Sequence, residues 1–329
     1  MAGWPRRHPA TIPHVNRDEW LARRTYRGAD FDPQELAHRA RRDSLRVSVC
    51  LPALNVAETV GPIVETLRTR LIEDVPLVSE IVVMDGSSTD GTRRAAREAG
   101  ARVVMDHEVL PGLIPGRGKG EAMWKSLAVL TGDLVVWLDA DVVDFDPAFV
   151  TGLLGPLLSD PEVGYVKALY RRGLGSDDEG GGRVTEICAR PLINLFYPDL
   201  AGFAQPLSGE AAGRRDLLCS VPFFNGYAVE IGLLIDLQRH AGLGALAQVD
   251  LGSRRHANQP TAALGAMAST ISHAVLKRVA QEGRAPDDLA GAGAYVRPVR
   301  EADGYVLTAL DTRPDERPPM TEVLQASIA

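Results

Sequence analysis

The chain alternates between short, nearly continuous apolar runs and longer stretches in which apolar residues recur every three or four positions. The short runs have the length and β-branched content of buried strands, and they cover residues 46–51, 80–84, 101–105 and 134–138. The longer stretches predict amphipathic helices, as in the face made by Val60, Ile63, Val64, Leu67 and Leu71. Strands that alternate with such helices predict an α/β fold, with a parallel sheet covered on both faces.

After about residue 155 the pattern changes to helices joined by glycine-rich segments. One strand is expected near 163–169 and a final strand near 246–251. Helices are expected near residues 183–197, 208–219, 227–240 and 261–282, before a proline-rich tail. This second half therefore predicts a mainly helical region around a few additional strands.

Polar clusters follow three of the predicted strands. They comprise the turn after Pro52, the loop from Asp85 to Asp90, and Asp139-Ala140-Asp141. Ligands of parallel sheets bind beyond the carboxyl ends of the strands, so these clusters are expected to converge on one rim. The sequence thus predicts one composite site rather than several separate ones.

The pair Asp139 and Asp141 directly follows the apolar run Val135-Val136-Trp137-Leu138. Two carboxylates at a strand end suit Mg²⁺ or Mn²⁺, which completes its shell with substrate phosphates and water. The alternative is a loop in which one Asp caps the next helix, but the position after a buried strand favours the metal. A neutral His256, after the final predicted strand, is a candidate nitrogen ligand, although a lone histidine more often has another role.

Asp85-Gly86-Ser87-Ser88-Thr89-Asp90-Gly91 combines hydroxyls, carboxylates and glycines at the start of a predicted helix. Such a loop can hold a nucleoside. It can also act as an N-capping turn with Ser88 or Asp90 as the cap, and the two interpretations are compatible.

Lys119 lies in the glycine-flanked segment Pro115-Gly116-Arg117-Gly118-Lys119-Gly120. The segment is not a Walker loop, because Leu113 and Gly120 stand where that motif requires Gly and Ser or Thr. A lysine ahead of a helix can still place its ammonium group against a diphosphate. No GxGxxG follows the first strand, which disfavours a dinucleotide oxidoreductase.

A second anion site is predicted where glycines 180–182 open a helix. Arg183 and Thr185 fall on its first turn, and arginine offers two parallel donors to a phosphate or carboxylate. The alternative is a flexible linker that precedes a capped helix.

Composition excludes several classes of protein. The 329 residues, 45% of them hydrophobic, are sufficient for a large packed core, and the net charge of -7 argues against nucleic-acid or membrane binding. No apolar run has the length of a membrane span. The three cysteines include no CxxC pair, so we expect neither disulfides nor a thiolate zinc site. This cysteine content predicts a cytoplasmic location.

In their order along the chain, these motifs resemble those of actinobacterial glucosyl-3-phosphoglycerate synthases, which are retaining type-A glycosyltransferases. The resemblance covers roughly residues 45–320 and rests on residues 51–55, 85–90, 119, 139–141, 180–186, 205–210, 226–230, 254–258 and 317–320. It implies a Rossmann-like fold with a mixed, mainly parallel sheet and a homodimer. Together with the arginine-rich composition of residues 1–44 and the change of pattern after about residue 155, it divides the chain into an N-terminal basic arm (1–44), a nucleotide-sugar-binding domain (45–155) and an acceptor-binding, helical region (156–329).

The resemblance also implies residue roles. Asp141 and His256 would ligate the metal, and Lys119, Asp139 and Glu230 would be catalytic. The nucleotide-sugar site would consist of Pro52, Ala53, Leu54, Asn55, Asp85, Ser88, Lys119, Asp139, Tyr227 and Glu230. The acceptor, 3-phosphoglycerate, would be bound by Gly182, Arg183, Thr185 and Asn258.

The implied reaction is transfer of glucose from UDP-glucose to 3-phosphoglycerate. GDP-mannose, used by the allied mannosyl-3-phosphoglycerate synthases, is the alternative donor, because Val56 replaces the acidic residue that tends to follow Asn55 in the glucosyl enzymes. A sugar nucleotidyltransferase is the alternative of another class, but it would need a basic, glycine-rich loop directly after the first strand, where Pro52-Ala53-Leu54-Asn55 stands. A catalytically silent nucleotide-sugar-binding protein is disfavoured because both metal and acceptor motifs are present.

Overall fold

The computed structural model describes residues 15–114, 116–172, 182–254, 261–284, 294–301, 304–311 and 315–326. Its strands are β1 Thr25–Arg27, β2 Val47–Ala53, β3 Glu80–Asp85, β4 Arg102–Met105, β5 Leu134–Trp137, β6 Tyr165–Arg172, β7 Ala211–Arg214, β8 Phe223–Phe224, β9 Leu246–Arg254, β10 Ala294–Glu301, β11 Gly304–Asp311 and β12 Glu316–Arg317. Its α-helices are α1 Arg17–Arg24, α2 Pro33–Arg42, α3 Ala57–Arg68, α4 Thr92–Glu98, α5 Gly118–Val129, α6 Ala148–Ser159, α7 Arg190–Phe196, α8 Arg215–Cys219, α9 Val229–Ala241, α10 Thr261–Gln281 and α11 Met320–Ala326.

The main sheet has eight strands in the order β1-β9-β6-β7-β5-β2-β3-β4. All neighbouring strands are parallel except β7, which runs antiparallel to both β5 and β6. The predicted α/β class with a mixed, mainly parallel sheet is therefore confirmed.

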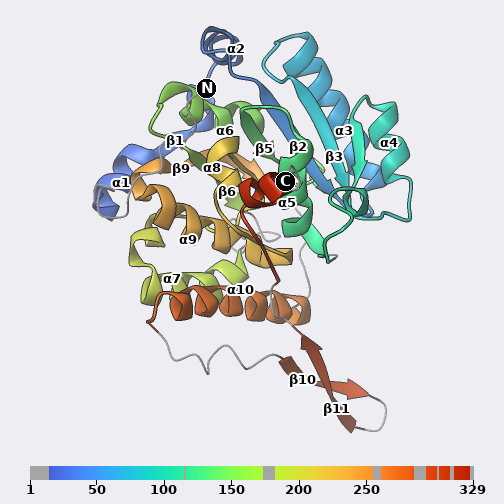
Figure 1. Ribbon diagram of the computed structural model, residues 1–329, viewed down its shortest axis with the longest axis vertical. Helices are drawn as coiled ribbons and strands as arrows, with labels where there is room; N and C mark the ends of the chain where they lie inside the picture. Colours follow the sequence, from blue (N-terminus) through green and yellow to red (C-terminus); the bar gives the residue numbers. More distant parts are fainter. Residues whose placement is uncertain are drawn as a thin grey trace.

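Helices cover both faces of this sheet (Figure 1), and each face has its own apolar core. The helices α2, α3, α4 and α6 pack on one face, and α5, α7, α8, α9 and α10 contribute to the core of the other. Strand β5 shows why its sequence is apolar throughout: Leu134 and Val136 belong to one core, and Val135 and Trp137 to the other.

The helix predicted over 208–219 is wrong for its first half. Residues 211–214 form β7, and only 215–219 are helical, as α8. Alanines favour a helix locally, but here Ala211 and Ala212 are fully buried between β5 and β6. A Cβ on Gly213 would lie 3.1 Å from a Leu218 methyl group and 3.2 Å from the Gly164 carbonyl, so small residues suit this central antiparallel strand.

Segments near both ends of the described part of the chain pack against the body of the protein. From the predicted basic arm, β1 pairs with β9 at the edge of the sheet, and the Trp20 indole donates to the Leu246 carbonyl at 2.7 Å. The strand predicted near 246–251 is present as β9, but it is not the final strand, because β10, β11 and β12 follow it. Strands β10 and β11 form a separate hairpin that projects from the body (Figure 1), and β12 pairs with β8.

Among the helices that the structure describes, none combines the length and apolar character needed to cross a bilayer.

Candidate active site

The turns after β2 and β3 are bound to each other. Asn55 has a φ of 55°, in the left-handed region that asparagine tolerates better than most residues. Its backbone N–H donates to Ser88 Oγ at 2.9 Å, and its side-chain oxygen accepts from the Thr89 N–H at 2.9 Å. Leu54, which lies between the end of β2 and Asn55, is 56% exposed. The predicted nucleoside loop is therefore held in one geometry against the first turn.

Asp85 lies at the base of these turns, at the last position of β3. Strand pairing places Pro52 beside Met84 and Ala53 beside Asp85. The Asp85 carboxylate is buried; one oxygen accepts from the Ser88 N–H at 2.9 Å, and the other has no hydrogen-bond partner within the described structure. Because an unsatisfied buried oxygen costs stability, Asp85 is suited to accept a hydrogen bond from a ligand.

Lys119, Asp139 and Glu230 meet beyond the carboxyl end of β5. Lys119 is the second residue of α5, Asp139 follows β5, and Glu230 lies in the first turn of α9. Lys119 Nζ lies 2.6 Å from Asp139 Oδ1, 3.0 Å from Glu230 Oε1 and 2.7 Å from the Gly209 carbonyl oxygen. The structure thus brings together the three side chains predicted to be catalytic.

The electrostatics keep Lys119 charged. Burial alone would lower the pKa of Lys119, but the negative charges of Asp139 and Glu230 raise it above the ordinary lysine value. The Lys119 and Asp139 side chains remain 20% and 24% exposed, so the cluster can be reached from solvent. A charged lysine that is partly exposed at the carboxyl ends of the strands is suited to bind a diphosphate.

Lys167 of β6 belongs to this cluster although it was not predicted. It is fully buried and pairs with Glu230 Oε2, so two lysines bind one carboxylate. Burial lowers the pKa of Lys167, against the opposing attraction of Glu230. The sequence did contain a signal for this role: Lys167 lies in the otherwise apolar strand Tyr165–Tyr170, and a lysine is rarely fully buried without a partner of opposite charge.

Residues 208–210 form the wall of the cluster. A Cβ on Gly209 would lie 2.0 Å from Asp139 Oδ2, so glycine is required for this approach. Glu210 is 1% exposed and accepts from the Tyr170 hydroxyl at 2.9 Å. Ser208-Gly209-Glu210 was recognised as part of a motif. Because a helix was predicted over these residues, their position beside Asp139 was not predicted.

The metal site is described in part. Asp139 and Asp141 lie in the turn after β5, and Asp141 is exposed, whereas His256 lies outside the described residues. Within the described residues, no group of three or more potential metal-ligating side chains occurs. Two carboxylates at one turn fit Mg²⁺ or Mn²⁺, since such cations take oxygen ligands and obtain the remainder from phosphates and water.

The predicted acceptor segment leads into the helical turn that precedes α7. Gly182 has a φ of 80°, and Thr185, 6% exposed, begins the helical turn η5 Thr185–Ala189. Arg183 lies between them, while Asn258 is outside the described residues. Tyr227, 56% exposed, lies in η7 Gly226–Ala228, immediately before α9. Helix α10 packs against both η5 and η7, which gives the Arg183 and Tyr227 segments a common support.

A mixed sheet with carboxylates and a cationic lysine at its strand ends is the arrangement of a glycosyltransferase that uses nucleotide-sugars. Residues 48–214 match the model of Glycosyl transferase family 2, and the chain belongs to that family. A curated relative, the glucosyl-3-phosphoglycerate synthase of Petrotoga mobilis, is 40% identical over 92% of this chain and 95% of its own length.

Three solved structures, of two proteins, are similar to this chain over almost their whole length. The mannosyl-3-phosphoglycerate synthase of Rubrobacter xylanophilus is 44% identical, with a TM-score of 0.88, over 95% of this chain and 99% of that one. The glucosyl-3-phosphoglycerate synthase of Mycobacterium tuberculosis in complex with Mn²⁺, UDP and phosphoglyceric acid is 39% identical, with a TM-score of 0.79, over 89% and 95%. The same enzyme with Mg²⁺ and UDP has a TM-score of 0.80 and 39% identity, over 91% and 99%.

Proposed function

We propose that this chain is a metal-dependent, retaining hexosyltransferase that moves glucose from UDP-glucose to 3-phosphoglycerate and forms glucosyl-3-phosphoglycerate. The observation that carries the proposal is the contact of Lys119 with both Asp139 and Glu230 at the sheet's carboxyl edge. The names and ligands of its relatives support the choice of donor and acceptor.

The side chains have separable roles in this reaction. Lys119 offsets the charge that develops on the diphosphate as the glycosidic bond breaks. Asp141 and His256 would hold Mg²⁺ or Mn²⁺, which supplies additional positive charge to the leaving UDP. Glu230, which is in contact with both Lys119 and Lys167, would contact the transferred sugar. The acceptor hydroxyl oxygen then forms the new bond to the anomeric carbon as the bond to UDP breaks; UDP leaves with the electron pair, and the hydroxyl proton passes to the departing diphosphate.

GDP-mannose is the second candidate donor, because the solved mannosyl-3-phosphoglycerate synthase matches this chain with a TM-score of 0.88. We expect kcat/KM for UDP-glucose to exceed that for GDP-mannose by about tenfold or more, a difference of about 1.4 kcal/mol in transition-state binding. Both donors are to be measured with 3-phosphoglycerate at one pH and one metal concentration. A preference for GDP-mannose would overturn the glucosyl assignment and leave the acceptor and the cluster unchanged.

We propose that Gly182, Arg183 and Thr185 bind the phosphate and carboxylate of the acceptor. Arg183→Ala should raise the KM for 3-phosphoglycerate about 10- to 100-fold, because a charge-assisted contact is lost, with less than about a twofold change in the KM for UDP-glucose. Arg190→Ala is the matched control, since Arg190 lies on the same helical run but pairs with Glu186 at 2.7 Å. Equal changes in both KM values would assign Arg183 a different role.

We also propose that the chain forms a homodimer in the cytoplasm. Ile187 and Leu195 are 74% and 73% exposed on the η5–α7 run, and the β10–β11 hairpin projects from the body near α10 (Figure 1). Such apolar surface is typical of an interface. The three cysteines are free and buried, which suits a reducing compartment. Sedimentation equilibrium at the mass of one 35.4 kDa chain would contradict the dimer, and isolation of the native protein from a secreted fraction would contradict the location.

A further inference from the structure

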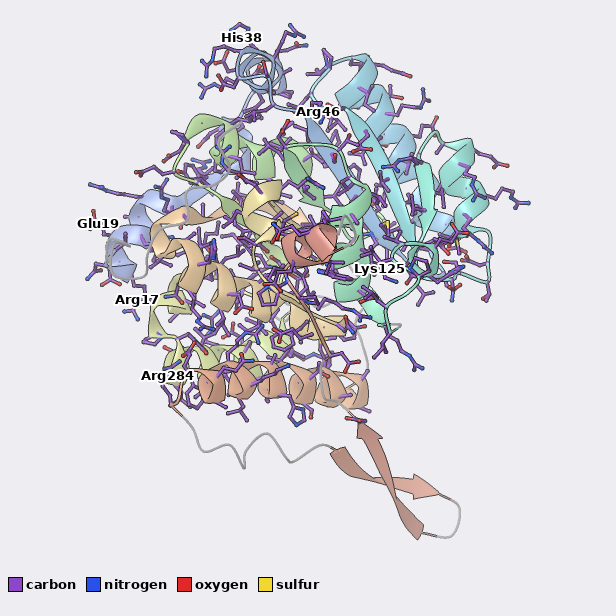
Figure 2. The ribbon with its side chains drawn as sticks, in the orientation of Figure 1. Arg17, Glu19, His38, Arg46, Lys125 and Arg284 are labelled. Atoms are coloured by element: carbon purple, nitrogen blue, oxygen red, sulfur yellow. The ribbon has the colours of Figure 1, made fainter. Side chains whose placement is uncertain are left out.

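The C-terminal segment returns to the helix that carries Lys119. Strand β12 pairs antiparallel with β8, with Arg317 opposite Phe223, and the Trp124 indole of α5 donates to the Pro318 carbonyl at 2.9 Å. Helix α11 then packs against α5, on which Lys125 is labelled (Figure 2). Residues almost 200 positions apart in sequence therefore form one local structure.

Arg317 binds a buried carboxylate two residues after Lys119. Its Nε lies 2.7 Å from Glu121 Oε2 and its Nη2 2.9 Å from Glu121 Oε1, a two-point contact. Glu121 is fully buried, and it also accepts from the Gly116 N–H at 3.2 Å and pairs with Lys125 at 3.3 Å. Arg317 donates as well to the Ile114 carbonyl, so it holds the loop before α5 together with the first turn of that helix.

Strand β8, which pairs with β12, links the start of α5 to the segment that carries Glu230. A Cβ on Gly120 would lie 2.0 Å from the Phe224 carbonyl oxygen, so the start of α5 contacts the end of β8 backbone to backbone. The Gly226 N–H donates to the Arg117 carbonyl at 3.1 Å, and four residues later comes Glu230 in α9. Arg317 thus contacts the Lys119 helix through its side chain, and its strand pairs with β8, which precedes the segment that carries Glu230.

We propose that Arg317 is a positioning residue for the transfer reaction: its contact with Glu121 sets Lys119 in register with Glu230 and Asp139. This inference rests on the proposed function, in which Lys119 meets the donor diphosphate. A small displacement of a charge aimed at the diphosphate weakens donor binding and slows transfer, because the reaction depends on placement at the ångström scale. Acceptor binding, assigned to Arg183 on another segment, is unaffected.

The test uses Arg317→Met and Arg317→Lys in the full chain, after wild-type turnover of UDP-glucose with 3-phosphoglycerate has been established. For Arg317→Met we expect kcat to fall about 10- to 100-fold and the KM for UDP-glucose to rise several-fold, with the KM for 3-phosphoglycerate unchanged. Calorimetry should show weaker binding of UDP but unchanged binding of UMP, which lacks the second phosphate. Arg317→Lys keeps the charge and should recover part of both losses.

Arg278→Met is the matched control. Arg278 is also buried, binds the Asp236 carboxylate at 2.8 and 2.7 Å and pairs with Glu316 of the same β12 strand, but these contacts join α10 to α9 and β12 rather than to α5. We expect it to lower the melting temperature while the kinetic constants of the folded enzyme remain close to wild type. If Arg278→Met reproduced the kinetic losses, or if Arg317→Met had wild-type constants per folded molecule, the inference would be overturned.

A double-mutant cycle with Glu121→Gln, with kcat measured per folded molecule, tests whether Arg317 acts through Glu121. Because Arg317 is expected to act through Glu121, the double variant should lose no more in kcat than the more damaging single variant. Additive losses would show that Arg317 affects turnover by another route. Absence of wild-type turnover with either donor would instead overturn the proposed function itself.

Discussion

Lys119→Met is expected to lower kcat by about two to three orders of magnitude, the cost of removing a principal stabiliser of transition-state charge. The substituted side chain has nearly the same length, so the change removes mainly the charge that now contacts Asp139 and Glu230. Steady-state kinetics under saturating donor and acceptor provide the measurement. Lys277→Met, at a lysine of α10 that is 38% exposed, is the control for a general effect of losing a lysine. A loss smaller than about tenfold would remove Lys119 from the mechanism.

The pKa of Lys119 adds a constraint on the pH profile of the same reaction. Burial lowers this pKa, but Asp139 and Glu230 raise it to a value above that of an ordinary lysine. A raised pKa means that the charged form persists as pH rises, so deprotonation of Lys119 should cause no loss of activity between about pH 7 and 9. A fall in kcat within that range must therefore come from another group.

Asp141→Asn is expected to lower kcat by about two orders of magnitude or more, because it removes one of the two carboxylates that the β5 turn offers to a divalent cation. EDTA should abolish the activity of the wild-type enzyme, and added Mn²⁺ or Mg²⁺ should restore it. Asp144→Asn, three residues further along the same exposed turn, is the matched control and should remain active. Full activity of the wild type in chelator would contradict the metal-dependent reaction.

The Lys119–Asp139–Glu230–Lys167 arrangement also suggests how the site is prepared for the donor. The buried Glu230 carboxylate contacts two lysines, one from α5 and one from β6, and these contacts fix its position. Lys119, in contrast, is partly exposed and contacts both carboxylates, so it can approach an incoming diphosphate while those carboxylates keep it protonated. We therefore propose separate roles for the two lysines: Lys167 supports Glu230, and Lys119 contacts the donor.

The alternation of apolar runs and amphipathic helices was sufficient to predict the parallel half of the sheet. Strands of a parallel sheet are buried on both faces, so β2, β3 and β5 are largely apolar and can be recognised locally. Because parallel strands present their carboxyl ends at one edge, the motifs at Asn55, Asp85 and Asp139 could also be assigned to a common rim. The contact of Asn55 with Ser88 and the position of Lys119 beside Asp139 agree with that prediction.

Other features depend on contacts between distant residues and carry little local signal. The sequence Ala-Ala-Gly of β7 favours a helix until β5 and β6 enclose it, and Lys167 has a clear role only once Glu230 is placed against it. Arg317 and Glu121 are ordinary charged residues in the sequence, and only the folded chain brings them within 2.7 Å. Periodicity reports which side of an element is buried, because burial repeats along the element, whereas the partner of a buried charge is decided by the packing of separate elements.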